Sequence, residues 1–239
     1  MKEINDLIGY KNLKIVQNPD WFKFSLDSVL LPRFVTINRN TKNILDIGTG
    51  NAPIPLILST RTNSKIFGIE IQKDVFELAK ETIKINHMDS QIQIINDNVK
   101  NIGKYFNYEF FDIIVSNPPY FKVYDQTIKN DNLHKTIARH EILLNVEDVI
   151  KIASVYLKNN GTLAIVHRSD RLIELIELFK KYNIEPKKIQ LVYPKIGICA
   201  NTVLIEGRKG GHVGLKVCPS IIVHNKDGSY SDQILEYFS

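Results

Sequence analysis

Short apolar runs alternate with longer amphipathic stretches from about residue 43 to residue 182. Each run has the length of one buried strand, and the stretch 73–87 repeats apolar residues at the i, i+3, i+4 spacing of one helix face. The alternation predicts an α/β fold in which helices cover both faces of a mostly parallel sheet. Asn160-Gly161 predicts a left-handed cap at the end of the third helix. The predicted strands are 43–47, 65–70, 91–95, 111–116 and 161–166, and the predicted helices are 53–60, 73–87, 145–158 and 169–182.

The pattern changes near both ends of the chain. Two strand-like stretches, 188–193 and 202–206, are joined by a short loop, which predicts an antiparallel hairpin that closes the edge of the sheet. The glycine-rich, basic stretch 207–216 predicts a mobile loop outside the core. Residues 1–42 are too short for a domain, so we expect a small N-terminal cap packed on one domain formed by residues 43–239.

The composition is that of a globular chain with a modest excess of positive charge. Of the 239 residues, 44% are hydrophobic and 24% are charged, which allows a proper core and argues against disorder. No apolar run approaches the ~18 residues that cross a membrane, the N-terminus has no apolar leader, and Cys199 and Cys218 lack metal-ligand spacing. These features predict a cytoplasmic protein with reduced thiols. The net charge of +5 favours an anionic partner, although a solvated lysine-rich surface explains it equally well.

A glycine turn follows the first predicted strand. The sequence D-I-G-T-G-N contains Asp46, Gly48 and Gly50, and such glycines let a backbone turn tightly beside a ligand at the start of a helix. A second acid, Glu70, ends the next strand, where a carboxylate can accept from both hydroxyls of a ribose. The turn and the acid together predict a nucleotide-like cofactor.

Two prolines after the turn narrow the identity of this cofactor. The third glycine of the dinucleotide fingerprint is missing, and Pro53 and Pro55 remove N–H donors that a pyrophosphate would use. S-adenosylmethionine has no pyrophosphate, so it fits this turn better than NAD does.

The predicted cofactor-binding set extends along the next two strand ends. Asp97, just past the strand 91–95, is placed to accept from the adenine amino group, and Asn98 to donate through its backbone. Both residue types are also common turn formers, which is the competing explanation. Ile71, which follows Glu70, completes this part of the set.

The stretch S-N-P-P-Y follows the strand 111–116 and lies at the edge where ligands bind in open α/β sheets. The prolines stiffen the backbone, so the side-chain oxygen of Asn117 and the carbonyl oxygen of Pro118 point outward as two fixed acceptors. Two acceptors suit an NH₂ group, and Tyr120, after Pro119, offers an aromatic face to a planar substrate. These four residues are the predicted catalytic set for methyl transfer to nitrogen, which needs alignment rather than a general base.

With these motifs in this order, the chain resembles class I S-adenosylmethionine-dependent methyltransferases that modify exocyclic or amide nitrogens. Further segments look like the bacterial family of tRNA1(Val) adenine-N6 methyltransferases, so the resemblance covers the chain from about residue 10 to residue 233. These segments are F-K-F-S-L-D-S-V-L-L at 22–31, A-R-H-E at 138–141, H-R-S-D-R-L at 167–172, V-Y-P-K at 192–195 and N-T-V-L-I-E-G-R-K-G-G at 201–211.

The resemblance implies a Rossmann-like sheet of seven strands, mostly parallel, with an antiparallel C-terminal hairpin. It implies S-adenosylmethionine as the methyl donor, Asn117 to Tyr120 as the clamp on the target base, and Asp27 in a segment that covers the cofactor. The substrate that it implies is the adenosine just 3′ to the anticodon of a valine tRNA.

An RNA substrate requires phosphate contacts and a base that leaves its stack. A solvated surface charge is the competing explanation for each basic residue. The histidines show no paired spacing typical of a metal site, so no metal is expected. A homodimer is compatible with the sequence, but no sequence feature indicates one. The predicted RNA-contacting residues are Arg139, His140, Lys195, Arg208 and Lys209.

Other functions stay open at this point. A protein-glutamine N5-methyltransferase acting on release factors also presents an NH₂ group to N-P-P-Y, but such enzymes usually carry a helical N-terminal domain. A guanine-N2 rRNA methyltransferase and a DNA adenine methyltransferase, which normally has a target-recognition domain, are further alternatives. A catalytically silent RNA-binding protein has no physical need for Asp46, Glu70, Asp97, Asn117 and Tyr120 together.

Overall fold

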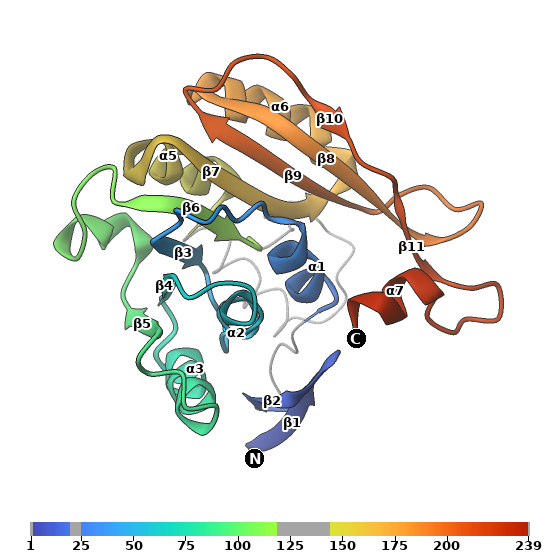
Figure 1. Cartoon of the computed structure of the whole chain (residues 1–239), viewed down its shortest axis with the longest axis horizontal. Coiled ribbons are helices and arrows are strands. Elements are labelled where there is room, and N and C mark those ends of the chain that lie inside the picture. The colour runs from blue at the N-terminus through green and yellow to red at the C-terminus, as the bar shows by residue number, and fades with distance from the viewer. Residues whose placement is uncertain (1, 20–24, 119–143, 239) are drawn as a thin grey trace, which may run out of the picture.

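The computed structural model describes residues 2–19, 25–118 and 144–238. Its centre is a twisted sheet of nine strands in the order β10-β8-β9-β7-β6-β3-β4-β5, with β11 also paired to β8 (Figure 1). The strands are β3 (Asn43–Ile47), β4 (Lys65–Glu70), β5 (Ile92–Asn96), β6 (Phe111–Ser116), β7 (Leu157–Arg168), β8 (Ile184–Lys195), β9 (Thr202–Lys209), β10 (Lys216–Val217) and β11 (Ile221–His224).

The strand directions confirm a mostly parallel sheet with an antiparallel C-terminal part. β3 to β7 pair in parallel, whereas β9 runs antiparallel to both β7 and β8. β9 thus lies between β7 and β8. In their spatial order, the seven strands β5-β4-β3-β6-β7-β9-β8 form the expected Rossmann-like sheet. The short strands β10 and β11 were not expected, and because both pair with β8, the hairpin does not close the edge.

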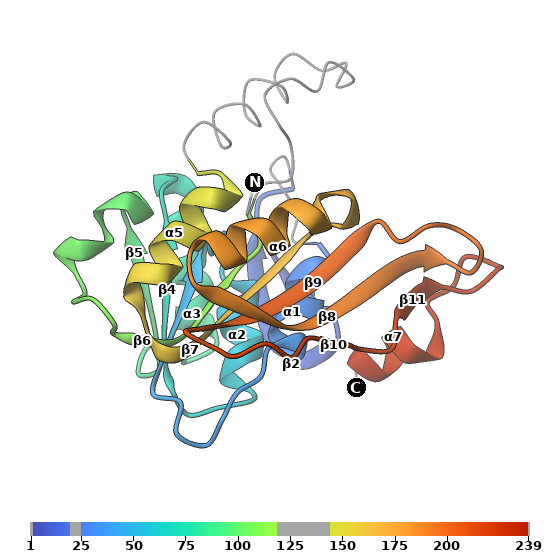
Figure 2. The ribbon, with the colours of Figure 1, turned by 90° about the horizontal axis from the view of Figure 1, so that it is seen from above.

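Helices cover both faces of this sheet (Figures 1 and 2). Strand residues alternate between two cores, so Ile44 and Ile113 pack on one face and Leu45 and Ile114 on the other. The first core takes in α1 (Asp27–Phe34), α2 (Pro53–Ser59) and α3 (Lys73–Ile85), and the second α5 (Val146–Tyr156) and α6 (Leu172–Lys181). Two 3₁₀ turns, η1 (Val99–Lys104) and η2 (Ser169–Arg171), and a last helix, α7 (Asp232–Tyr237), complete the described elements.

Two local predictions were wrong. Helix α5 ends at Tyr156, because the buried Leu157 already has extended backbone and pairs with Phe111. Asn160 does have a left-handed φ of 62°, but it lies inside β7, so it caps no helix. The start of the predicted loop 207–216 belongs to β9, where a Cβ on Gly207 would lie 2.6 Å from the Phe179 ring. That glycine permits close packing rather than flexibility.

The described hairpin before α1 packs on the helices of one face. β1 (Glu3–Leu7) and β2 (Tyr10–Gln17) form a separate antiparallel pair that the hydrophobic pattern did not predict. The backbone N–H of Val16 donates to the hydroxyl of Thr82 at 3.0 Å, which ties β2 to α3. The hairpin is therefore held against a helix rather than against the sheet itself.

Candidate active site

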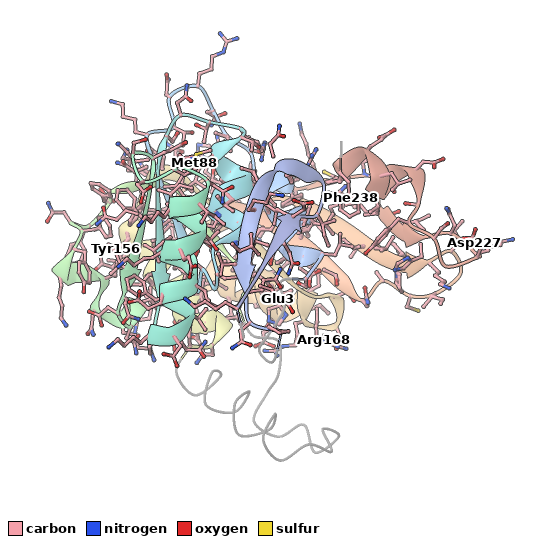
Figure 3. The ribbon with its side chains drawn as sticks, turned by 90° about the horizontal axis from the view of Figure 1, so that it is seen from below. Glu3, Met88, Tyr156, Arg168, Asp227 and Phe238 are labelled. Atoms are coloured by element: carbon pink, nitrogen blue, oxygen red, sulfur yellow. The ribbon has the colours of Figure 1, made fainter. Side chains whose placement is uncertain are left out.

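The carboxyl ends of four neighbouring strands meet at one edge of the sheet, here called the carboxyl edge. Ile47 at the end of β3 lies opposite Ile69 of β4 and Ser116 of β6, and Glu70 lies opposite Asn96 of β5. Parallel neighbours are about 4.8 Å apart, so the segments that follow these strands begin side by side. Figure 3 labels Arg168, where β7 ends on the same edge.

The backbone of the glycine turn after β3 is held by hydrogen bonds and borders open space. Gly48 and Gly50 have left-handed φ values of 74° and 57°, and a Cβ added to either would meet no atom within 4 Å. The Gly48 N–H donates to the Ile69 carbonyl at 3.0 Å, and the Gly50 N–H donates to Glu70 Oε2 at 3.0 Å. A ligand can therefore approach this backbone closely.

Asp46 is a fully buried acid, and one of its two carboxylate oxygens has no donor among the described residues. Its Oδ2 accepts from the Thr49 hydroxyl at 2.7 Å, while Oδ1 has no hydrogen-bond partner within the part of the chain that the structure describes. Burial raises the pKa of Asp46 to about 7, with the Thr49 hydrogen bond opposing and the nearby Glu70 charge adding to the rise. An unfilled buried acceptor costs free energy until a donor reaches it.

Glu70 links the end of β4 to the glycine turn. Besides Gly50, its carboxylate accepts from the Gln72 backbone N–H at 3.0 Å. The Asn96 side chain donates to the Glu70 carbonyl at 2.8 Å and so fixes the end of β5 to the same place. Ile71, which follows, is 38% exposed and places an apolar surface next to this carboxylate.

Asp97 is already bound by its own loop. It accepts from the Asn101 side chain at 2.7 Å, the Tyr105 hydroxyl at 2.9 Å and the Asn98 backbone N–H at 2.7 Å, and these donors lower the pKa of Asp97 to about 2. The Asn98 side chain in turn accepts from the Lys100 N–H and caps η1. Both residues therefore form the turn, and any further acceptor use of Asp97 shares its oxygens with these donors.

Two serines hold the start of N-P-P. The Ser116 hydroxyl donates to the Ile47 carbonyl at 2.8 Å, which ties the end of β6 to β3. Asn117 follows, half-buried, and its Nδ2 lies 3.4 Å from the hydroxyl oxygen of Ser28 in α1. Pro118 is buried. Ser28 lies in the segment 22–31 that carries the family resemblance, but the sequence assigned it no role and did not pair it with Asn117.

The first turn of α1 also carries Asp27, so the structure brings this residue to the carboxyl edge with Asn117. The Ser25 hydroxyl lies 3.3 Å from Asp27 Oδ2, and the backbone N–H of Ser28 donates to the Ser25 carbonyl at 3.0 Å. Pro119 and Tyr120, the rest of the predicted catalytic set, lie outside the described residues.

The predicted RNA-contacting residues do not share one edge. Lys195 ends β8, which runs in the direction of β7, and therefore lies on the carboxyl edge. Arg208 lies opposite Thr162 near the start of β7, and Lys209 lies opposite Ile184 at the start of β8. Both are therefore on the opposite edge of the sheet, where the parallel strands begin, here called the amino edge. Lys209 is also bound to the Glu109 carboxylate at 3.0 Å. Arg139 and His140 lie outside the described residues.

His167 is a buried titratable group that begins the resemblance segment 167–172 but was given no role in the predicted site. β7 pairs with β6 so that Ile165 lies opposite Ser116, which puts His167 beside the start of N-P-P. Its Nδ1 accepts from the Arg168 N–H at 2.8 Å. Burial, together with the Arg171 charge, lowers the pKa of His167 to about 4, so the ring is neutral near pH 7. A lone histidine in an apolar run is typical of a core residue, which is why its pattern did not mark it.

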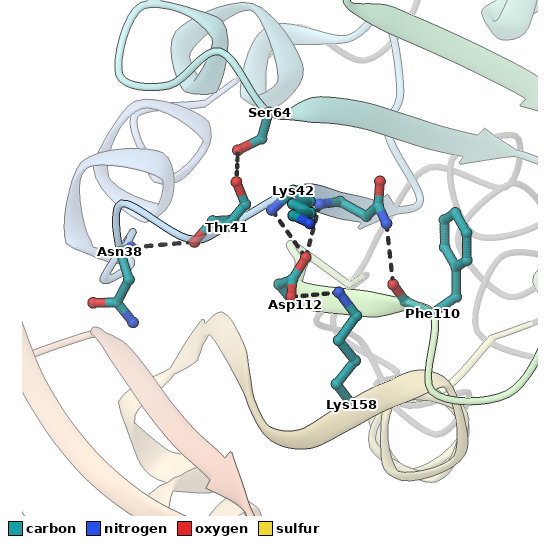
Figure 4. Close-up of polar contacts among 8 residues, drawn as sticks. Asn38, Thr41, Lys42, Ser64, Phe110, Asp112 and Lys158 are labelled. Atoms are coloured by element: carbon teal, nitrogen blue, oxygen red, sulfur yellow. Dashed lines mark hydrogen bonds and ion pairs between the residues drawn. The ribbon is translucent and has the colours of Figure 1, made fainter.

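The opposite edge of the sheet is closed by its own polar contacts (Figure 4). Asp112 at the start of β6 accepts from the backbone N–H groups of Lys42 and Asn43, each at 2.9 Å, and from Lys158 Nζ at 2.6 Å. A hollow on this edge is lined by Arg39, Thr41, Lys42, Thr62, Asn63, Ser64 and Lys65. It lies at the other end of β3 from the glycine turn and takes no part in the candidate site.

The fold is that of a class I methyltransferase, and comparison with known families agrees. The chain belongs to the methyltransferase small domain family, whose model matches residues 25–189. It is 24% identical, over 97% of its length and 95% of the relative's, to a tRNA1(Val) (adenine(37)-N6)-methyltransferase from Cytophaga hutchinsonii. It is 28% identical to the protein of that name from Aeromonas hydrophila, over 98% of this chain and 96% of the relative.

A solved structure supports the fold independently. A protein from Agrobacterium tumefaciens described as a predicted O-methyltransferase aligns with a TM-score of 0.69 at 20% identity, over 89% of this chain and 95% of the other. Within residues 2–19, 25–118 and 144–238, no helix is long and apolar enough to cross a membrane. The same residues contain no group of three His, Cys, Asp or Glu side chains arranged to hold a metal ion.

Proposed function

We propose that this protein transfers a methyl group from S-adenosylmethionine to the exocyclic N6 of an adenosine in tRNA. Membership of the methyltransferase small domain family supports the reaction type. The names of two relatives that match almost the whole chain support the substrate. The finer proposal is the adenosine 3′ to the anticodon of a valine tRNA.

The residues proposed to hold the cofactor lie along the carboxyl edge. S-adenosylmethionine, when bound, supplies a methyl group on a positively charged sulfonium. The bare backbone at Gly48 and Gly50 leaves room for such a ligand, and the spare oxygen of Asp46 offers it an acceptor. The Glu70 carboxylate, fixed by two backbone N–H groups, is suited to ribose hydroxyls. The full proposed set is Asp27, Asp46, Gly48, Gly50, Glu70, Ile71, Asp97 and Asn98.

The single observation that carries the proposed chemistry is Asn117 at the end of β6, one strand away from the glycine turn. Its Oδ1 and the Pro118 carbonyl accept the two hydrogens of the target NH₂ group, which turns the nitrogen lone pair toward the methyl donor. The N–C bond would form as the S–C bond of the sulfonium breaks and leaves a neutral thioether, and the nitrogen would then lose one proton to water, so no base is required beforehand. Pro119 and Tyr120 complete the proposed clamp.

The proposed RNA surface follows the carboxyl edge. Lys195 lies on this edge and is retained as a phosphate contact, as are Arg139 and His140, which rest on the sequence alone. Arg208 and Lys209 are left out, because six residues of β9 separate them from the carboxyl edge, roughly 20 Å at about 3.4 Å per residue.

The proposed function is tested by methyl transfer from labelled S-adenosylmethionine into total tRNA that lacks the modification, followed by nucleoside analysis. We expect label in N6-methyladenosine, and none when the adenosine 3′ to the anticodon of a valine tRNA transcript is replaced by guanosine. Label in N2-methylguanosine, or in a release factor offered in the same assay, would instead assign the protein to a different substrate class.

A further inference from the structure

Helix α1 contacts Asn117 through one buried hydroxyl. Ser28, the second residue of α1, is 6% exposed, and its Oγ lies 3.4 Å from Asn117 Nδ2. The three residues that follow, Val29, Leu30 and Leu31, are fully buried in the core shared with α2. The hydroxyl therefore projects from a rigid element.

The direction of the Asn117 amide decides whether it can bind a target amine. An amide has an accepting oxygen at one end and a donating NH₂ at the other, and the two ends have nearly the same shape. Packing alone cannot choose between the two orientations, so hydrogen bonds must do it. With Nδ2 toward Ser28, the oxygen turns away from α1. In the reverse orientation the Ser28 hydroxyl would donate to Oδ1, but the Asn117 NH₂ group would face the target NH₂ group and could accept neither of its hydrogens.

We infer that Ser28 is a positioning residue, whose oxygen accepts from Asn117 Nδ2 and thereby keeps Oδ1 directed at the target amine. This inference rests on the proposed function. Ser116 and Ser28 then hold different parts of the same segment. Ser116 fixes the backbone at the end of β6 through Ile47, and Ser28 fixes the side chain that follows, from the opposite face of the sheet.

The test replaces Ser28 by alanine and by threonine and separates kcat from binding. We expect kcat to fall about 10- to 100-fold in Ser28→Ala, since a small misplacement of a reacting group has an effect of this size. KM for tRNA and the equilibrium affinity for S-adenosylmethionine should stay within about twofold. Ser28→Thr keeps the hydroxyl and should recover most of kcat.

Ser64→Ala is the matched control. Ser64 is equally buried, at 6% exposure, and its hydroxyl donates to the Thr41 carbonyl at 2.8 Å on the amino edge. Both alanine variants should lower the melting temperature, but only Ser28→Ala should lower kcat. An active wild type with equal kcat in the two alanine variants would refute the inference alone, as would a loss of cofactor affinity that matches the loss of kcat. A wild type inactive on all tRNA would refute the proposed function as well.

Discussion

Asp46 and Asp112 lie at opposite edges of the same sheet, and their surroundings differ. Asp112 accepts from three donors, the N–H groups of Lys42 and Asn43 and the ammonium of Lys158 (Figure 4). Burial raises the pKa of Asp112, but these donors outweigh burial and hold it below its usual value. Among the described residues Asp46 has a single side-chain donor and one bare oxygen, and burial raises its pKa to about 7.

The contrast separates an acid whose acceptors are filled by protein donors, Asp112, from one with an acceptor that a ligand can fill, Asp46. A buried carboxylate whose acceptors are filled by its neighbours stabilises the protein, whereas an unfilled acceptor is destabilising until something donates to it. Perturbed acids of the second kind cluster at functional sites. At the amino edge the protein's own donors fill the acceptors of Asp112, whereas at the carboxyl edge one oxygen of Asp46 is available to a ligand.

The largest expected effect is the loss of catalysis in Asn117→Ala. Because the amide oxygen is one of two proposed acceptors for the target amine, we expect the single-turnover rate to fall about 10²- to 10³-fold. Binding of S-adenosylmethionine, measured by calorimetry, should change less than twofold. Asn43→Ala removes an asparagine from the amino edge, where its side chain donates to the Phe110 carbonyl, and should leave the rate unchanged. Loss of cofactor affinity in Asn117→Ala would contradict its proposed role.

Asp46→Asn should shift stability and cofactor binding in opposite directions. Between its ordinary pKa of 3.8 and the folded value of about 7, the folded protein holds one proton more than the unfolded chain. Stability conferred by Asp46 therefore falls as pH rises through this window, and asparagine removes that loss. We expect the variant without cofactor to melt higher than wild type at pH 8 and by a smaller margin at pH 5.

The same variant should bind S-adenosylmethionine about tenfold more weakly at pH 8, since a charged acceptor is replaced by a neutral one. Melting curves at both pH values and a cofactor titration provide the measurements. An equal melting difference at pH 5 and pH 8 would show that Asp46 does not titrate between them.

The sequence predicted the main sheet and much of the carboxyl edge, because both follow from local patterns. Buried parallel strands are short apolar runs, and the residue after each run necessarily lies on the same edge as its neighbours. Asp46, Glu70 and Asn117 could therefore be grouped from the order of residues alone. Whether Asp97 was an acceptor or a turn former could not be decided in that way, since it depends on Asn101 and Tyr105 folding back on the carboxylate.

The features that the sequence could not place depend on packing between distant segments. Gly207 suggested a loop, but the Phe179 ring occupies the space where a side chain would lie, so β9 continues to Lys209. That continuation carries Arg208 and Lys209 to the amino edge. The contact between Ser28 and Asn117 joins residues 89 positions apart, and no periodicity records it.

Asp112→Asn should reduce stability and leave catalysis unchanged. Loss of the charge weakens hydrogen bonds to Lys158 and to two backbone N–H groups, which we expect to lower the free energy of unfolding by about 1–2 kcal/mol. Because the pKa of Asp112 is depressed in the fold, its contribution is present above about pH 4 and is lost as pH falls through the folded pKa. Urea unfolding should therefore separate variant and wild type at pH 7 and less so in acid. A reduced methylation rate at temperatures where the variant is folded would place Asp112 in the active site instead.

The smallest expected effect compares one cation from each edge. Lys195→Glu and Arg208→Glu change the net charge equally, so any effect of total charge is common to both. Only Lys195 lies on the carboxyl edge, and we expect its variant to raise KM for tRNA a few-fold and to lower the salt dependence of binding by about one phosphate contact. Arg208→Glu should match wild type in both measurements. Equal losses in the two variants would mean that tRNA responds to overall charge, and the functional division between the two edges would not extend to RNA binding.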